Sequence, residues 1–296
     1  MKAIKRMTSN SYRGVAALAL ALAALALLPA DGQFRGGGRF RRSYEIRDPA
    51  RLREQEIMQK AINPEFREDV FTFARLKFQA DRDYRFGGGR LWDDDAPDAD
   101  LNLIFRLFEV TSMRVRPGLN FIDITTKDLA NYPFVYLASA GRVVLTAEEA
   151  AALRQYLLNG GFLMADDFWG DDQWAHFYQQ IKSVFPNREP VELTLEDRIF
   201  HTVFDFKKQP QIPSVGAFMS TGQSYDPGWP YDEKNHDPHY YALYDDKKRM
   251  MAILCHNNHY GDGWEHEGDD ETYFDKFSEP MAYPMLINIL VYTVSH

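Results

Sequence analysis

Two strand–helix units in succession between residues 133 and 185 constrain the fold of this chain more than any other feature. Residues 133–138 (PFVYLA) and 162–165 (FLMA) are short apolar runs, which are typical of strands buried on both faces. Thr146 and Glu149 form a capping-box pattern ahead of the helix between them. Short connections between alternating strands and helices predict a mostly parallel sheet with helices on both faces.

The flanking sequence extends this α/β pattern over residues 66–296, which we predict to form a single domain. Residues 240–243 and 250–254 predict an antiparallel hairpin within the sheet. A polar, aromatic loop over 219–239 is long enough for a lid or binding loop. Further elements are predicted as a strand over 70–78 and as helices over 49–62, 101–111, 171–185 and 280–295.

Residues 1–30 have the pattern of a secretory signal peptide. Four basic residues precede an uninterrupted apolar run over 15–28, and about 14 residues are too few to span the roughly 30 Å of hydrocarbon in a bilayer. We therefore expect cleavage after Ala30 or Gln33 and a periplasmic or secreted protein, with an uncleaved anchor as the alternative. Residues 31–65 predict a flexible basic linker followed by a short helix.

The composition narrows the classes of function. A formal net charge of −9 disfavours binding to nucleic acid or to anionic lipid, so membrane contact is expected only through an uncleaved signal segment. The single cysteine, Cys255, cannot form an intramolecular disulfide, and the core must fold without one. The composition leaves the partner open, and carbohydrate and another envelope protein are the two classes that we consider.

Four sequence blocks carry a resemblance to a known family. They are GGFLMADDFWG (160–170), FPNREPVELTLEDRIFHTVFDF (185–206), QIPSVGAF (211–218) and NNHYGDGWEH (257–266). Together they resemble the bacterial family catalogued as domain of unknown function 4159, from about Asp69 to the C-terminus. The resemblance implies a class I glutamine amidotransferase-like fold, which is a flavodoxin-like three-layer α/β sandwich, and no established activity. The family has an acidic residue where this chain has His259.

The turn after the predicted strand 162–165 is the first candidate site. Asp166, Asp167 and Trp169 lie there, at the carboxyl end of a strand, where open α/β sheets bind ligands. By the resemblance, true amidotransferases hold a nucleophilic cysteine at this turn. Since this chain has aspartate there, glutamine transfer is excluded. Carboxylates at this position disfavour a phosphate ligand and favour a cation or a neutral polyol, although the same acids are also suited to capping the next helix.

The loop over 257–266 is the second candidate site. Asn257, Asp262 and Trp264 are its predicted ligand-binding residues, because the glycines on both sides of Asp262 favour a turn with unusual backbone angles. The aromatic faces of Trp169, Trp229 and Trp264 lie in acid-rich loops, where they suit sugar rings. The alternative is that these loops fold down and bury their tryptophans.

Histidines near the predicted hairpin raise the question of a metal. A hairpin centred on 246–247 pairs His256 with Asp237, and gathers His236, His239, His256 and His259 at one edge of the sheet. No cofactor is predicted from this pattern, because two H-x-x-H repeats in loops are a weak signal. A divalent metal held by His256 and His259 is the alternative to solvated surface histidines.

These observations leave two hypotheses of function. The first is a non-catalytic exported binding or assembly module on an amidotransferase-like scaffold without the catalytic cysteine. The second is a hydrolase of a saccharide or ester, possible also in a metal-assisted form, in which Asp167 is the nucleophile or general base and Glu265 its partner. The second hypothesis requires these two carboxylates within roughly 5–10 Å of each other across one open pocket, with Trp169 and Trp264 as its walls.

Overall fold

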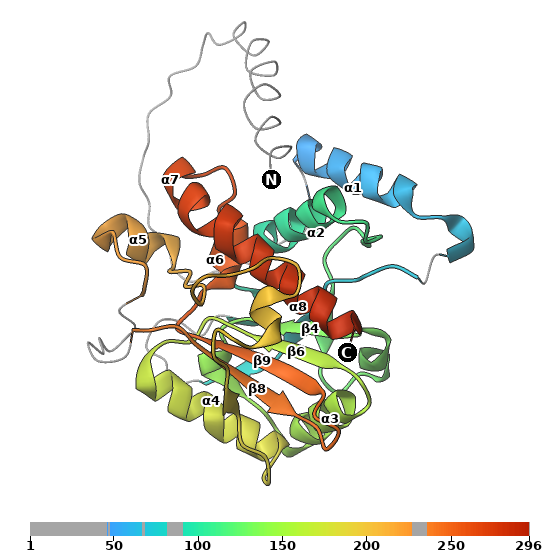
Figure 1. The fold of residues 1–296 in the computed structure, drawn as a ribbon. Coiled ribbons are helices and arrows are strands. Elements are labelled where there is room, and N and C mark those ends of the chain that lie inside the picture. The colour runs from blue at the N-terminus through green and yellow to red at the C-terminus, as the bar shows by residue number, and fades with distance from the viewer. Residues whose placement is uncertain (1–45, 47, 67–68, 82–90, 227–235, 296) are drawn as a thin grey trace, which may run out of the picture. The chain divides into compact units, whose positions relative to one another are not determined.

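A computed structural model describes residues 46, 48–66, 69–81, 91–226 and 236–295 (Figure 1). The chain divides into two units, Met1–Ser43 and Tyr44–His296, and every described residue belongs to the second. The predicted signal peptide, the basic part of the linker and Trp229 lie outside the described residues.

A seven-stranded sheet with the order β3-β1-β4-β6-β9-β8-β7 forms the centre of the second unit. The first five strands pair in parallel, and β8 and β7 continue the sheet in antiparallel pairs. A two-stranded antiparallel sheet, β2 with β5, lies apart from it. The prediction of an α/β fold with a mostly parallel sheet and an antiparallel hairpin is confirmed. In chain order the strands are β1 Arg75–Lys77, β2 Gln79–Ala80, β3 Phe121–Asp123, β4 Phe134–Leu137, β5 Val143–Val144, β6 Phe162–Ala165, β7 Val191–Glu192, β8 His239–Tyr244 and β9 Met250–His256.

Helices cover both faces of the large sheet, as Figure 1 shows. On one face, α3 and α4 pack on Val135 and Leu137 of β4, whereas Phe134 and Tyr136 of the same strand pack on the opposite side with α2, α6 and α8. This alternation follows from the two-residue period of a strand, and it is compatible with a three-layer sandwich. The helices are α1 Pro49–Ala61, α2 Asp98–Val110, α3 Ala147–Leu158, α4 Gly170–Val184, α5 Val215–Thr221, α6 Tyr260–Glu265, α7 Glu271–Tyr273 and α8 Tyr283–Ser295.

Shorter helical segments complete the described structure. A π-helical segment, Phe274–Ala282, joins α7 to α8 and contains Pro280. The last helix therefore does not begin at Pro280 as predicted. Proline has no amide to donate, and the regular α-helical pattern begins only at Tyr283. Within the described residues, none of the helices combines the length and the apolarity needed to cross a membrane. The 3₁₀ turns are Pro64–Phe66, Leu91–Asp93, Lys127–Asn131, Ala140–Arg142 and Arg198–His201.

Local signals predicted the centre of the chain well. The capping box at Thr146 and Glu149 is present at the start of α3, and β6 has the predicted bounds. The hairpin register is different, because a turn over 245–249 and a register shift between Leu243 and Tyr244 move β8 along β9. His256 therefore lies opposite His239 instead of Asp237.

Candidate functional site

Polar loops that follow four parallel strands meet at one edge of the sheet. Asp94 and Asp95 lie between β1 and α2, Ser139 follows β4, Asp167 follows β6, and 257–262 follow β9. Because the carboxyl ends of parallel strands lie at the same edge, these loops converge where open α/β sheets bind ligands. Sequence reasoning found the last two loops and missed the first two.

The backbone takes a left-handed conformation at one residue in each of these four loops. The φ angles are 62° at Asp95, 45° at Ser139, 54° at Asp167 and 58° at Asn257, and a fifth non-glycine residue of this kind among the described residues, Lys248, lies in the hairpin turn. Side chains with a Cβ adopt such angles at a cost, and residues held this way concentrate at functional sites. Four of them around one edge mark it as the candidate site.

His259 stands among three carboxylates at this edge, and we call Asp95, Asp167, His259 and Asp262 the acidic cluster. Its Nε2 lies 3.3 Å from Asp95 Oδ2 and 3.5 Å from Asp262 Oδ1, while Nδ1 lies 3.7 Å from Asp167 Oδ1. The side chains are 8% exposed at Asp95, 9% at Asp262, 12% at His259 and 21% at Asp167. Solvent therefore reaches the cluster from the side of Asp167.

The pKa values of the residues in the acidic cluster are shifted in different directions. Burial lowers the pKa of His259, but Asp167, Asp262 and Asp95 together raise it well above its usual range. Burial raises the pKa of Asp262 to about 6, and His259 opposes that shift. The pKa of Asp95 is lowered because His259 and Arg75 outweigh its burial. The imidazolium form of His259 thus neutralises part of a site rich in negative charge.

Close backbone approach sets the position of Asp95. A Cβ built on Gly261 would lie 1.9 Å from Asp95 Oδ2, so only glycine at position 261 leaves room for this carboxylate. Gly261 is the second residue of α6. The glycine that sequence reasoning assigned to a turn therefore serves to admit a carboxylate from a loop more than 160 residues earlier.

A hydroxyl links Asp167 of the cluster to one further carboxyl group, that of Asp94. Ser139 Oγ lies 2.9 Å from Asp94 Oδ2 and 2.8 Å from Asp167 Oδ2. One hydroxyl hydrogen serves one acceptor at a time, so the second short contact requires a proton on one of the carboxyls. Burial, helped by Asp167, raises the pKa of Asp94 to about 7, and burial also raises the pKa of Asp167. We call these three residues the Asp94–Ser139–Asp167 bridge.

Asp166, the neighbour of Asp167, supports the site from inside. It is fully buried, and its Oδ2 accepts hydrogen bonds from Tyr136 Oη at 2.9 Å and from the Tyr260 amide at 2.6 Å. Burial raises the pKa of Asp166 to about 8. This predicted ligand-binding residue therefore anchors the start of α6, and Asp167 is the member of the pair that solvent reaches.

Comparison with known proteins agrees with the resemblance found in the sequence. Residues 72–294 match the profile of the family described as "Domain of unknown function (DUF4159)". The chain belongs to this family. The match spans the whole acidic cluster and the Asp94–Ser139–Asp167 bridge. No curated protein matches the sequence.

Three further predicted residues of this DUF4159 chain are engaged in packing or in contacts with neighbouring side chains. Trp264 is fully buried and packs edge-on against Phe73, and Trp169 is only 6% exposed. Neither offers an open face to a sugar ring. The Glu265 carboxylate lies 3.3 Å from His266 Nε2, at the far end of α6 from His259.

The four histidines near the hairpin do not form one group. His256 is buried, lies 3.0 Å through Nε2 from the Gly170 carbonyl oxygen, and stacks on His239 with ring centroids 5.7 Å apart. Burial lowers the pKa of His256 to about 4. His236 stacks on Tyr225. Two groups with ligand atoms within 4.8 Å of one another occur among the described residues, Asp95–His259–Asp262 and Asp262–Glu265–His266, and His256 is in neither.

Three residues of the site left faint sequence signals. Asp94 and Asp95 lie in the run WDDD, which resembles a solvated loop, and Ser139 is a small polar residue directly after an apolar strand. A search for polar residues at the carboxyl end of every predicted parallel strand would have found Ser139, because that edge is where such sheets bind ligands.

Proposed function

We propose that this DUF4159 protein is an exported binding module that holds a divalent cation of the zinc class through Asp95, His259 and Asp262. The observation that carries the proposal is the spacing between His259 Nε2 and the carboxylate oxygens of Asp95 and Asp262. The parallel sheet with helices on both faces supports the amidotransferase-like scaffold, and the apolar run over 15–28 supports export.

The spacing fits a metal better than a hydrogen bond. Hydrogen bonds between an imidazolium and a carboxylate are about 2.7–2.9 Å long, whereas the two contacts of His259 Nε2 are 3.3 and 3.5 Å. Four ligands at about 2.0–2.1 Å from a tetrahedral zinc ion lie about 3.3–3.4 Å from one another. The two contacts of His259 Nε2 thus match the edge length of a zinc site, and all three residues have ligand atoms within 4.8 Å of one another.

The ligand types favour zinc and its neighbours over the alkaline-earth ions. Calcium and magnesium prefer oxygen ligands only, while an imidazole with two carboxylates suits zinc and similar transition metals. Asp167 is the most exposed member of the cluster and lies beside the other nitrogen of His259. Because Nδ1 points away from a metal bound at Nε2, Asp167 is placed to hold the imidazole ring in orientation, as carboxylates commonly do for metal-binding histidines.

Calorimetric titration of the full chain with zinc chloride, after removal of metal by a chelator, tests the proposal. We expect one tight site per chain, and a loss of at least about 100-fold in affinity for Asp95→Asn and for His259→Gln, since changes even to residues behind the ligands cost about 10–100-fold. Asp246→Asn is the matched control, because this carboxylate lies in the hairpin turn and is 90% exposed. Equal zinc affinity in wild type and both ligand variants contradicts the proposal.

A second candidate function rests on the Asp94–Ser139–Asp167 bridge. Two carboxyl groups joined through one hydroxyl form a pair in which one gives a proton while the other accepts one, as general acid–base hydrolysis requires. This keeps Asp167 in the role the sequence predicts for it and replaces Glu265 by Asp94 as its partner. The substrate class is a saccharide or ester of the envelope.

Hydrolysis of 4-nitrophenyl acetate and of 4-nitrophenyl glycosides by the full chain tests this candidate. We expect Asp167→Asn and Asp94→Asn each to lower kcat/KM by at least about 100-fold. Asp246→Asn again serves as the control. If wild-type turnover equals that of Asp167→Asn, the hydrolase candidate is wrong. The zinc proposal does not depend on that result.

A further inference from the structure

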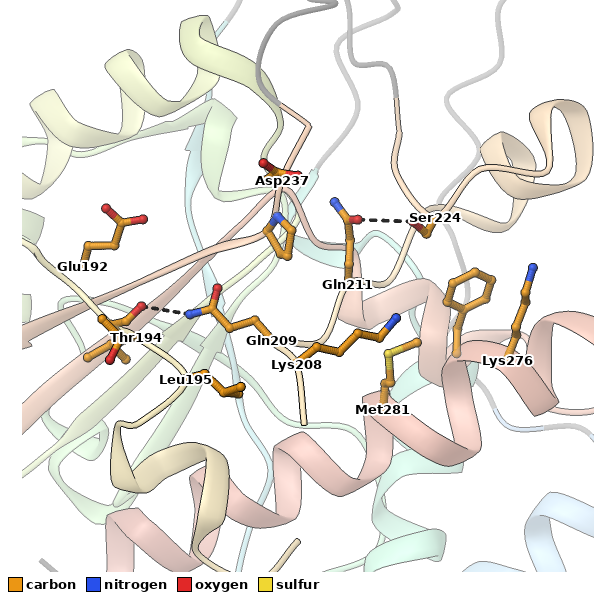
Figure 2. Close-up of a pocket in the computed structure, with 13 residues that line it drawn as sticks. Glu192, Thr194, Leu195, Lys208, Gln209, Gln211, Ser224, Asp237, Lys276 and Met281 are labelled. Atoms are coloured by element: carbon orange, nitrogen blue, oxygen red, sulfur yellow. Dashed lines mark hydrogen bonds between the residues drawn. The ribbon is translucent and has the colours of Figure 1, made fainter. Parts of the chain in front are cut away.

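A cavity of about 710 Å³ opens beside β7 (Figure 2), and two carboxylates, Glu192 and Asp237, are among its lining residues. Glu192 lies 2.6 Å from His239 Nδ1 and is thus already paired. Within the described residues, neither carboxylate belongs to a group of atoms that could hold a metal ion. The groups suited to a further ion lie instead at the C-terminal end of α6.

A second group of candidate metal ligands follows the acidic cluster along α6. Asp262, Glu265 and His266 form it, with ligand atoms within 4.8 Å of one another. His259, Asp262 and His266 are spaced three and four residues apart, which places them on one face of a helix. Asp262 therefore belongs both to this group and to the acidic cluster.

The Nε2 atom of His266 has nearly the same surroundings as that of His259. It lies 3.3 Å from Glu265 Oε2 and 4.0 Å from Asp262 Oδ1. For His259 Nε2 the corresponding distances to carboxylate oxygens are 3.3 Å and 3.5 Å, and the second is to the same Oδ1 atom. The surroundings that support a cation at His259 thus occur a second time, around one shared oxygen.

The other nitrogen of His266 is held in the way that is common for metal-binding histidines. Nδ1 lies 2.9 Å from Asp269 Oδ2, which is a normal length for a hydrogen bond between histidine and a carboxylate. When Nδ1 donates its hydrogen to Asp269, the lone pair of Nε2 is left for a metal. Asp269 thus stands behind His266 as Asp167 stands behind His259, and such carboxylates orient the ring of a metal ligand.

The two oxygens of Asp262 have different contacts. Oδ2 accepts a hydrogen bond from the Val215 amide at 2.6 Å, so Oδ1 is the oxygen that both histidines approach. An ion bound between Oδ1 and His266 would lie beside an ion bound between Oδ1 and His259. Two ions that share a carboxylate oxygen fit the spacing of about 3.5–4 Å that is typical of two-metal sites.

Buried contacts fix the backbone at this end of α6, while the ligand side chains stay open to solvent. Asn102 of α2 is 3% exposed, and its Nδ2 donates to the carbonyl oxygens of Trp264 at 2.7 Å and Glu265 at 3.0 Å. The side chains of Glu265 and His266 are 29% and 23% exposed. An ion can therefore reach them directly, and a small rotation of His266 shortens its distance to Asp262.

We propose that Asp262, Glu265 and His266 hold a second divalent cation of the zinc class, bridged to the first through Asp262 Oδ1. This inference rests on the proposed function, because the bridge requires an ion at Asp95, His259 and Asp262. The second ion binds more weakly than the first, since its ligands are more exposed and like charges repel across one shared oxygen.

The zinc content of the full chain, measured by equilibrium dialysis and elemental analysis, tests the proposal. After removal of metal by a chelator and dialysis against excess zinc chloride, we expect two zinc ions per wild-type chain. His266→Gln and Glu265→Gln should each retain one. His201→Gln is the matched control and should retain two, because this exposed histidine also contacts a carboxylate, Asp205, and belongs to neither group of ligands.

Two further measurements report on the bridge and on Asp269. Asp269→Asn should weaken binding of the second ion by about 10–100-fold and leave the first unchanged. With cobalt(II) in place of zinc, two bridged ions couple magnetically, so the electron paramagnetic resonance signal per cobalt should be weaker in wild type than in His266→Gln.

The outcomes separate this inference from the proposed function. One zinc ion per chain in both wild type and His266→Gln overturns the second site and leaves the first standing. Two ions in both also overturn it, because the second ion is then held elsewhere, and equal cobalt signals per ion overturn the bridge. A wild-type chain that binds no zinc overturns the proposed function and this inference together.

Discussion

The end of β9 has two sides with opposite chemistry, and His256 and His259 report on them. His256 lies on the aromatic side, stacked between His239 and Phe168, and burial lowers its pKa to about 4. His259 lies three residues later on the acidic side, where the carboxylates raise its pKa. The same side-chain type is held neutral on one side of a strand end and charged on the other, because neighbours decide which form is stable.

The comparison teaches where ligand chemistry belongs in this fold. On the aromatic side, His256 Nε2 lies against the Gly170 carbonyl and the ring packs on Phe168 and on Trp174 of α4, so this side contributes stability. The acidic side concentrates charge and left-handed backbone angles around solvent-accessible carboxylates, which is the arrangement of a ligand site. Breaking each side separately should therefore have different consequences.

The largest change in stability is expected when the buried side chain that supports the acidic side, Trp264, is removed. Trp264 of α6 is fully buried and packs against Phe73 and Tyr136. Trp264→Ala should lower the free energy of unfolding by about 3–5 kcal/mol, as large-to-small core changes do, measured by denaturant unfolding. Met219→Ala, at a side chain 61% exposed, is the control and should change it by less than about 0.5 kcal/mol. If Trp264→Ala changes the free energy of unfolding only slightly, Trp264 is not a core residue, and its predicted role as a wall of the ligand site is favoured again.

Acid should test the aromatic side. The pKa of His256 is near 4 in the folded state and about 6.5 when unfolded, so the unfolded state takes up a proton as pH falls below 6.5 and stability declines until about pH 4. The loss is up to about 3 kcal/mol. His256→Gln keeps a donor for the Gly170 carbonyl and cannot titrate. The fall in stability between pH 7 and pH 5 should therefore be smaller in this variant than in wild type; an identical fall contradicts the assignment.

Replacing Gly261 by alanine adds one methyl group, which should destabilise the acidic side and leave the aromatic side unchanged. Gly261→Ala places a Cβ against Asp95, and crowding of this kind costs about 1–3 kcal/mol. Zinc affinity should fall with it. Gly216→Ala in α5 is the matched control: a Cβ there meets nothing within 4 Å, and helix propensity predicts a small gain in stability. Unfolding and zinc titration of both variants decide whether the fit of Asp95 against glycine matters.

The smallest effect is expected at Asp166. Because burial raises its pKa to about 8, the carboxyl is protonated at pH 7, and Asp166→Asn preserves an oxygen that accepts from Tyr136 and from the Tyr260 amide. The free energy of unfolding at pH 7 should stay within about 1 kcal/mol of wild type or rise. Asp166→Ala, which leaves those donors without a partner, should lose more. A loss above about 2 kcal/mol in the asparagine variant would show that the charged form supports the fold.

Local sequence patterns predicted the sheet and half of the site, for physical reasons. The capping box of α3 joins Thr146 to Glu149, only three residues away, and β6 is defined by its own apolar run. Both elements can therefore be predicted from neighbouring residues alone. Asp95 follows β1 and Gly261 follows β9, with β4 and β6 between them in the sheet, and nothing near either residue encodes that contact. The hairpin register depended on a one-residue irregularity at Leu243. The burial of Trp264 could not be decided from the sequence, because α6 is a six-residue helix containing two glycines, which propensity disfavours.

Residues 211–215 form a wall with two sides. Gln211 lines the cavity beside β7, while the Ile212 carbonyl accepts from the His259 amide at 2.8 Å and the Val215 amide donates to Asp262 Oδ2 at 2.6 Å. A displacement of this wall moves both a cavity residue and two residues of the acidic cluster. If binding at either place shifted residues 211–215, each ligand would change the affinity of the other by the same factor, as thermodynamic linkage requires.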